Sequence, residues 1–274
     1  MAVGAYLGET AQDYEFAGPV NLPAETIVNT MGVWTQLIAS TTFDAQGFLL
    51  GWEPNDSTIL NAEGLFDIGI GPDGSVRVVV NHLLISWSSG SGRQMEGHGY
   101  FPVSIPAGTR ISGRSQATTI SLGVNISSLV MVAGDQGFAE CTTFGSNAGT
   151  SDGTGVDPGA SAGTKGAWQQ MVASTPHDIF AISYGITRDG VDRTLSVARG
   201  RLDIGVGANP NEVVVIPDLP FWSQSSQDMH FPFHGAGPIP CYIPAGSRLV
   251  ARTVSSINTA GDRVPGVVLY GFGA

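Results

Sequence analysis

The sequence contains one series of motifs twice, and this duplication constrains the fold more than any other feature. The blocks keep their order, and the spacing between the two copies grows only from 134 to 138 residues. A nearly fixed period of this kind marks a repeated structural unit, so we interpret the chain as two copies of one domain. Four blocks recur: GVWTQLIAST (32–41) as GAWQQMVAST (166–175), FDIGIG (66–71) as LDIGVG (202–207), IPAGTRISGR (105–114) as IPAGSRLVAR (243–252), and LVMV (129–132) as VVLY (267–270).

A glycine-rich segment separates the two copies. Seven of the 22 residues at 145–166 are Gly, none is aromatic, and Val156 is the one large aliphatic residue. Such a segment cannot bury enough apolar surface to fold alone. It is either a flexible linker or an extended arm along a neighbouring domain or subunit. We therefore predict a first domain with an N-terminal arm at 1–144, a linker or arm at 145–166, and a second domain at 167–274.

Each copy has the pattern of β-structure. Residues 75–87 begin with polar–apolar alternation and then become apolar on both sides, as in a strand of a packed sandwich. Each IPAG block combines a Pro-Ala-Gly turn with an alternating strand. No window carries a 3.6-residue apolar stripe over three turns. The sequence therefore predicts an all-β fold of two tandem homologous β-sandwich or jelly-roll domains joined by a Gly-rich segment.

The charge composition argues against several classes of partner. Charged residues make up 13% of the chain, about half the usual share, and 12 basic against 23 acidic residues give a net charge of −11. Such a surface repels phosphate backbones and anionic membranes, so we expect no nucleic acid and no membrane as partner. The first 16 residues show no basic region followed by a long apolar core, so we expect synthesis in a cytoplasm without a signal peptide.

Two motifs of enzymes match by spacing alone. Gly69, Gly71 and Gly74 fit G-x-G-x-x-G, but a turn signal and a β-branched strand follow them, where a dinucleotide site needs a helix. We predict a hairpin there. G-x-S-x-G occurs at 149–153 and 159–163, without the strand-to-helix turn that exposes a nucleophilic serine. We therefore predict no catalytic residue, no cofactor and no cofactor-binding residue.

The histidines and cysteines give no metal-binding pattern. His230 and His234 flank a proline, and on a strand they lie about 13 Å apart, too far to share one ion. His98 occupies a comparable place in the first copy, which favours structural histidines over ligands. Cys141 and Cys241 show no pairing or metal spacing and are expected as buried free thiols. We predict no metal site.

The acids and arginines of the repeated blocks have structural interpretations. Asp67 and Asp203 cap backbone N–H groups at a turn, with Ca²⁺ binding as the alternative. Arginines four residues apart on a strand share one face, and we favour ion pairs across the sheet over contacts with another subunit. Two such pairs follow the IPAG turns: Arg110 with Arg114, and Arg248 with Arg252.

Tryptophans recur at equivalent places in the two copies. Trp34 aligns with Trp168, while Trp87 and Trp222 both lie between the DIG block and the IPAG turn. A tryptophan at the start of a domain is expected in the core. An exposed pair would instead stack on sugar rings, which keeps a glycan-binding alternative.

The blocks GAWQQMVAST, LDIGVG and IPAGSRL and the closing VVLYGFG resemble virion structural proteins of tailed bacteriophages, over most of residues 32–274. The resemblance implies a β-sandwich or jelly-roll component present in many copies, with no catalytic residue to carry over. It does not separate head from neck or tail.

The function expected from this resemblance is that of a non-enzymatic capsid decoration (cement) protein that stabilises the head. The alternatives are a tail or neck component of the virion and a pair of glycan-binding modules. A depolymerase would need converging acids or a His–carboxylate pair, which the sequence does not offer. The expected partners are further copies of the chain, as a homo-oligomer, and other virion proteins, above all the major capsid protein. The expected location is the virion, after synthesis in the host cytoplasm.

Overall fold

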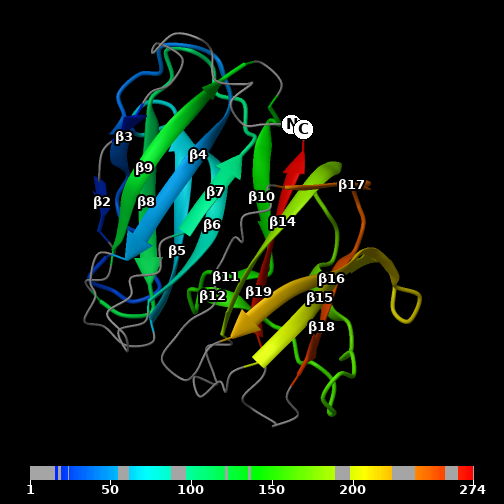
Figure 1. The fold of residues 1–274 in the computed structure, drawn as a ribbon. Helices are drawn as coiled ribbons and strands as arrows, with labels where there is room; N and C mark the ends of the chain where they lie inside the picture. The colour runs from blue at the N-terminus through cyan, green and yellow to red at the C-terminus, as the bar shows by residue number, and fades with distance from the viewer. Residues whose placement is uncertain are drawn as a thin grey trace.

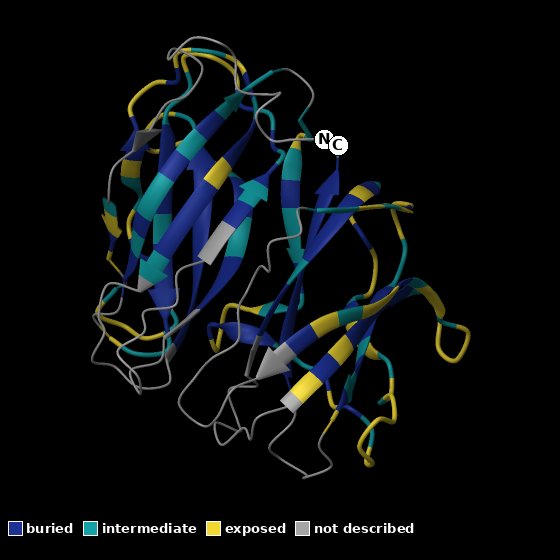
Figure 2. Ribbon diagram, in the orientation of Figure 1, coloured by how far each residue is buried: buried dark blue, intermediate teal, exposed yellow. Residues whose placement is uncertain are grey.

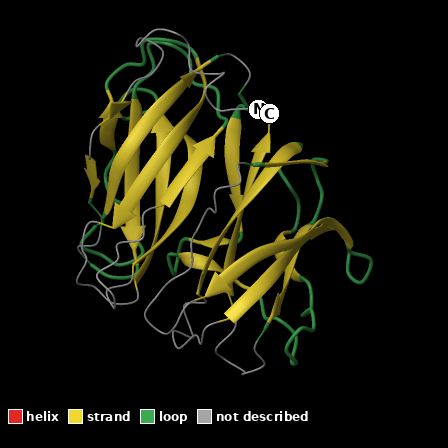
Figure 3. Ribbon diagram, viewed as in Figure 1, coloured by secondary structure: helices red, strands yellow, loops and turns green. Residues whose placement is uncertain are grey.

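The computed structural model describes residues 16–17, 20–23, 25–54, 62–87, 97–120, 123–134, 137–188, 198–223, 238–256 and 265–273. Within these ranges all the regular structure is β-strand and none is helix, which confirms the all-β fold class (Figure 3). No helix of the length and apolarity needed to cross a membrane occurs in them.

We call the described residues from 16 to 134 the first module and those from 137 to 273 the second module. The strands of the first module are β1 (Phe16–Ala17), β2 (Val20–Leu22), β3 (Thr35–Ile38), β4 (Ala45–Pro54), β5 (Ala62–Ile70), β6 (Arg77–Trp87), β7 (Gly97–Phe101), β8 (Ile111–Ala117) and β9 (Val124–Ala133). Those of the second module are β10 (Glu140–Phe144), β11 (Ser146–Asn147), β12 (Asp152–Gly155), β13 (Gln169–Val172), β14 (Ile179–Arg188), β15 (Ala198–Val206), β16 (Val213–Ser223), β17 (Ile239–Ile243), β18 (Leu249–Ser255) and β19 (Pro265–Gly273).

The two modules share one pattern of strand pairing, so the repeat in sequence is a repeat in structure. In the first, β3–β8–β5–β6 form one layer, and β7–β4–β9 with β1 and β2 form the other. In the second, the layers are β13–β18–β15–β16 and β17–β14–β19 with β10 and β12. Even a bulge recurs, because His82 on β6 and Asp218 on β16 have φ of 52° and 54°. Each module is a β-sandwich, and the domain boundaries set from the sequence stay a prediction.

One sheet continues from the first module into the second through β10 (Figure 1). β10 pairs antiparallel with β19 along its whole length. Its other edge pairs in parallel with β6, with Cys141 opposite Val80. Thr143 adds to this junction, because its N–H donates to Asn81 Oδ1 at 3.0 Å and its hydroxyl donates to the Asn81 carbonyl. Backbone pairing therefore joins the modules in addition to the chain itself.

β19 also completes the hydrophobic core of the first module. Alternate residues of β19 point into that core, and Tyr270 and Phe272 are fully buried there. The Phe272 ring centroid lies 6.4 Å from that of Phe101 on β7, and the Leu84 N–H of β6 donates to the Tyr270 hydroxyl at 2.9 Å. Figure 2 shows β19 buried along its length. The side of the first sandwich between β6 and β7 is thus closed by the second module.

The glycine-rich segment 145–166 packs on the second module through β12 and Val156, and its 146–151 part hydrogen-bonds to the first module. It contains β11 and β12, and Thr154–Gly155 of β12 pairs with the Gly266–Val267 part of β19. Val156, its large aliphatic residue, is fully buried in the second core. Pairing with an existing strand compensates for the few apolar side chains of the segment, since backbone groups of β12 find partners on β19.

Candidate functional site

The repeated motifs of the first module meet in one cluster on the outer face of the β3–β8–β5–β6 layer. Asp67 on β5 is buried and accepts the backbone N–H of His82 at 2.8 Å. It also accepts Arg114 Nε at 2.9 Å. The Arg114 guanidinium lies 4.4 Å above the ring of Trp34. The three sequence blocks therefore supply one ion pair, one backbone cap and one cation–π contact.

The second module builds the same cluster and adds a lysine. Asp203 accepts the Asp218 N–H at 3.0 Å and Arg252 Nε at 2.9 Å. Arg252 lies 4.3 Å above the ring of Trp168. Lys165 Nζ donates to both carboxylate oxygens of Asp203, at 2.8 and 2.7 Å. The first module has Met31 in place of Lys165, so the extra charge belongs to the second copy alone.

A glycine of each DIG block leaves the space in which the tryptophan ring packs. A Cβ on Gly69 would lie 2.9 Å from the Trp34 ring, and a Cβ on Gly205 would lie 2.8 Å from the Trp168 ring. Both tryptophans are half-buried on the outer face, so the expectation that they lie in the core is wrong. Each is clamped between a glycine backbone and an arginine, because the aromatic face attracts the guanidinium.

The electrostatics of the second cluster favour the charged forms. Burial is the largest single influence on Asp203 and would raise its pKa. Hydrogen bonds from Lys165, the Asp218 N–H and Arg252 together outweigh it and hold the pKa of Asp203 below its usual value. The hydrogen bond to Asp203 is the main cause that raises the pKa of Lys165. In the first module, burial lowers the pKa of His82, which favours its neutral form.

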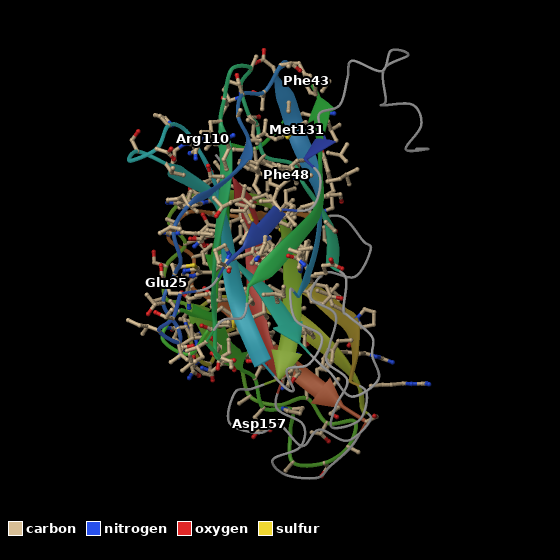
Figure 4. All side chains as sticks on the ribbon, turned by 90° about the vertical axis from the view of Figure 1, so that its left-hand side faces the viewer. Glu25, Phe43, Phe48, Arg110, Met131 and Asp157 are labelled. Carbon is tan, nitrogen blue, oxygen red and sulfur yellow. The ribbon has the colours of Figure 1, made fainter. Side chains whose placement is uncertain are left out.

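These contacts test the predictions for the acids and arginines. Capping by Asp67 and Asp203 is confirmed, and so is cross-strand ion pairing by the second arginine of each pair, Arg114 and Arg252. Figure 4 shows Arg110 at one edge of the first module, away from Phe48 and Met131 in its core. The first arginines of the pairs also have acidic and amide partners: Arg110 with Asp73 at 2.7 Å and Gln36 at 3.2 Å, and Arg248 with Glu212 at 3.0 Å and Gln170 at 2.9 Å.

The two enzyme-like motifs are turns between strands. Gly69 to Gly74 spans the end of β5 and the turn into β6, which confirms the hairpin. Ser151, in the first G-x-S-x-G match, lies between β11 and β12, and its hydroxyl donates to Asn29 Oδ1 at 2.8 Å. It also accepts Gln116 Nε2 at 2.8 Å. Its partners are amides, and neither is a base that could activate it.

Several predicted residues lie outside the described part of the chain. These are His230 and His234, and the side chains of His98, Trp87 and Trp222. Cys141 is a buried free thiol, as expected, whereas the free thiol of Cys241 is half-buried. Burial raises the pKa of Cys241 to about 11. Among the described residues, no three His, Cys, Asp or Glu side chains are grouped as metal ligands would be.

The sequence analysis missed a row of aromatic rings on the second module. Phe138 packs on Phe180 with parallel rings 6.4 Å apart, and Phe180 lies 5.7 Å from Tyr242. Phe180 is 41% exposed and Tyr242 60%. The first module has Gln46 and Ser104 at the positions of Phe180 and Tyr242, so the fold does not require the aromatic rings. A comparison of the repeats for differences, as well as identities, would have found them.

A hollow of about 360 Å³ adjoins each Trp–Arg–Asp cluster. In the first module β10 forms one wall of it, through Glu140 and Thr142. In the second module the wall carries Arg199 and Arg201 of β15 instead. The two hollows therefore differ in charge.

Comparisons with known proteins add no function. No family model matches the sequence, and no curated protein matches it. Among solved structures, PNGF-II aligns with a TM-score of 0.38 and 8% identity, over 93% of this chain and 65% of that one. PNGase F from Flavobacterium meningosepticum gives 0.30 and 7%, over 93% and 96%. The CBM22-1–CBM22-2 tandem domain of Paenibacillus barcinonensis Xyn10C gives 0.24 and 9%, over 98% and 95%. At these TM-scores the likenesses carry no argument about activity or ligand.

Proposed function

We propose that the chain is a non-enzymatic structural protein of a bacteriophage particle, a decoration protein on the capsid surface. The sequence resemblance supplies the class. The contact between the modules has a covering half, the face of β19 with Tyr270 and Phe272, and a receiving half, the side of the first sandwich between β6 and β7. The observation that carries the proposal is that the chain contains a counterpart of each half, and neither counterpart has a partner among the described residues. Such a chain can add further copies of itself.

The covering half of the contact is repeated on β9. Tyr270 pairs with Ser183 in the ladder, and Val130 pairs with Leu49 at the equivalent place. The ladders thus align Tyr270 with Val130, which corrects by two residues the block match that placed it opposite Val132. Phe272 pairs with Ala181, and Val132 with Gly47. The counterparts of the two buried rings are thus valines. Leu49 beside them is 42% exposed, whereas the two valines are half-buried and Tyr100 lies over Gly47, so the accessible apolar part of this face is at Leu49.

The receiving half is repeated between β16 and β17. Phe101, covered by Phe272 in the first module, corresponds to Ile239, which is half-buried. On β16, Val213 is 64% and Val214 38% exposed. Joining the β9 face of one copy to this side of the next is a heterologous contact, which continues into rings or arrays. A repeating contact suits a component that covers a lattice.

The chemistry of the clusters supports a role without catalysis. Asp67 and Asp203 hold a backbone N–H and an arginine each, and their carboxylates are buried. Catalytic acids must reach a substrate atom within hydrogen-bond distance, whereas these face the protein's own backbone. The clusters fix the bulges of β6 and β16.

The stoichiometry of purified particles tests the proposal. Quantitative mass spectrometry should find tens to hundreds of copies per particle, on the head surface by imaging. A few copies would move the protein to the neck or tail, and absence from particles would contradict a structural role. For the self-contact, Leu49→Glu and Val214→Glu should each reduce self-association in sedimentation, while Ile120→Glu, at an exposed loop residue, should not.

The aromatic row supports a second candidate, glycan binding by the second module. Exposed rings in a row are the platforms on which sugars stack through their apolar faces. A glycan array should then give binding that Phe180→Ala and Tyr242→Ala abolish. Val213→Ala, an exposed aliphatic change on β16, should leave it intact. A blank array, or binding unaffected by the aromatic variants, would exclude this row as a sugar site.

A further inference from the structure

We propose that the second module binds an oxyanion, a carboxylate or phosphate group, in the hollow between β15, β16 and β18. The hollow measures about 360 Å³, and Lys165, Arg199, Arg201, Asp218 and Ser256 contribute to its lining. Its volume falls in the range of small-ligand sites, which begins at about 300 Å³. The inference does not depend on a role in a virion.

Two arginines on one strand face the hollow together. Arg199 and Arg201 alternate along β15, so they project from the same side of the sheet. Gly200 between them faces the core, since a Cβ there would overlap the Phe221 ring. Arg201 is 65% exposed, and its contact with Asp218 is long, at 3.9 Å. Both guanidinium groups can therefore turn toward a ligand.

Among the described residues, positive charges outnumber negative charges around the hollow. Lys165 and Arg252 share Asp203 as their carboxylate partner, and Lys165 Nζ also lies 3.2 Å from Asp218. Arg199 and Arg201 add two positive charges and have Asp218 as the carboxylate of the lining. This local excess of positive charge occurs in a chain with a net charge of −11. It attracts anions to the hollow over the rest of the surface.

The first module shows that the fold does not need these arginines. The ladders place Glu63 where the second module has Arg199, and Leu65 where it has Arg201, and both are buried. The segment between β11 and β12 covers that face, because Gln116 Nε2 donates to the Ala148 carbonyl at 2.7 Å. In the second module the described residues leave this face as a hollow with two arginines.

The donors of the hollow match an oxyanion. A guanidinium presents a planar fork of N–H groups that fits two oxygens of a carboxylate or phosphate. Ser256 Oγ accepts the Arg199 backbone N–H at 2.9 Å, which leaves its hydroxyl proton for a ligand oxygen. Asp218, on the opposite wall, would accept a hydroxyl from the same ligand, as a sugar acid or sugar phosphate provides.

Calorimetric titration of the full chain tests this site. The probes are glucuronate for a carboxylate, inorganic phosphate for a phosphate, and glucose as the neutral control, all at one ionic strength set with NaCl. We expect saturable binding of at least one anion and none of glucose. The tighter anion identifies the ligand group.

Variants assign the binding to the arginines. The double variant Arg199→Gln/Arg201→Gln should weaken binding about tenfold or more, since two charge-assisted contacts are lost. Arg77→Gln removes an exposed arginine of the first module and should bind as the unmodified chain does. Thermal unfolding confirms that each variant is folded. The proposal is overturned if neither anion binds saturably, or if the double variant binds as tightly as Arg77→Gln.

Discussion

At the residue scale, the recurring blocks are explained by one interaction that needs all of them at once. Trp34 and Trp168, just before β3 and β13, occupy the space left by a glycine two strands away, and an arginine on the adjacent strand covers the ring. The buried aspartate then holds the arginine. Substituting any member leaves a buried charge, a gap or a clash, so the three blocks must recur together.

Gly69→Ala should destabilise the first module by about 2 kcal/mol, because the new methyl overlaps Val76 and meets the Trp34 ring. In a Trp34→Ala background the same change should cost much less, since Val76 can move into the vacated space. Denaturant unfolding of the four proteins measures the coupling. Gly149→Ala, at an exposed turn residue, serves as control and should stay within about 0.5 kcal/mol. An equal loss of stability from Gly69→Ala in both backgrounds would contradict the close contact between Gly69 and the Trp34 ring.

Asp203→Asn should reduce stability at pH 7 by about 3 kcal/mol, because it removes the buried carboxylate that Lys165 and Arg252 share and leaves Lys165 with Asp218 alone. The folded state holds the pKa of Asp203 below its unfolded value, so this stability is complete above the unfolded pKa. It is lost as the pH falls through the folded pKa. The free energy of unfolding, measured between pH 6 and pH 2, should therefore fall less steeply with decreasing pH for the variant than for the unmodified protein. Asp73→Asn, at an exposed ion pair, should show the same pH dependence of stability as the unmodified protein. If the unmodified protein and both variants lost stability in parallel, Asp203 would not be the source of the pH dependence.

At the element scale, the IPAG turns show why a turn signal can be read from sequence. Gly108 and Gly246 have φ of 76° and 80°, and a Cβ on either would meet nothing within 4 Å. Thr41 and Thr175 each hold the turn by donating to the proline carbonyl, at 2.7 and 2.9 Å. A side chain would fit at either position. The glycine is therefore required only for its left-handed backbone conformation.

Gly246→Ala should therefore cost about 1 kcal/mol, from the left-handed conformation alone. Gly246→Asn should cost less, because Asn tolerates that region. Thermal unfolding of both variants gives the comparison. Ala245→Ser, a change of the exposed neighbour, should have little effect. A larger loss with Asn than with Ala would indicate a steric cause that this geometry does not contain.

The sequence predicted those elements that depend on neighbouring residues in the chain. Alternation gave the strands, and the Pro-Gly turns gave the hairpins, as at 70–77 between β5 and β6. β10 was not predicted, because Glu140–Phe144 forms a strand only through its partners on β6 and β19. For 145–166 the sequence left open a flexible linker or an arm along a neighbouring domain, and the pairing of β12 with β19 is of the second kind. Capping by the aspartates and cross-strand pairing by the arginines were predicted without their partners, while the arginine hollow depends on how the described residues around it pack.

At the scale of the whole molecule, the second module supplies part of the hydrophobic core of the first. Cys141, Tyr270 and Phe272 belong by position to the second module and by packing to the core of the first. Ala181 on β14 joins them there. A duplicated sequence suggests two domains that fold independently, but here the second copy completes the first. Unfolding of the second module would expose the open side of the first sandwich.

Phe272→Ala tests this coupling, because Phe272 lies in the first core on a strand of the second module. The loss of a buried ring should cost about 3 to 5 kcal/mol. Scanning calorimetry should show one cooperative transition, moved to a lower temperature as a whole, since the first core includes side chains of the second module and opens when that module unfolds. Ile27→Ala, at a residue 66% exposed on the first module, should leave the transition in place. Two separate transitions, with only one of them shifted by Phe272→Ala, would mean that the modules unfold independently and that the shared core does not bind them into one unit.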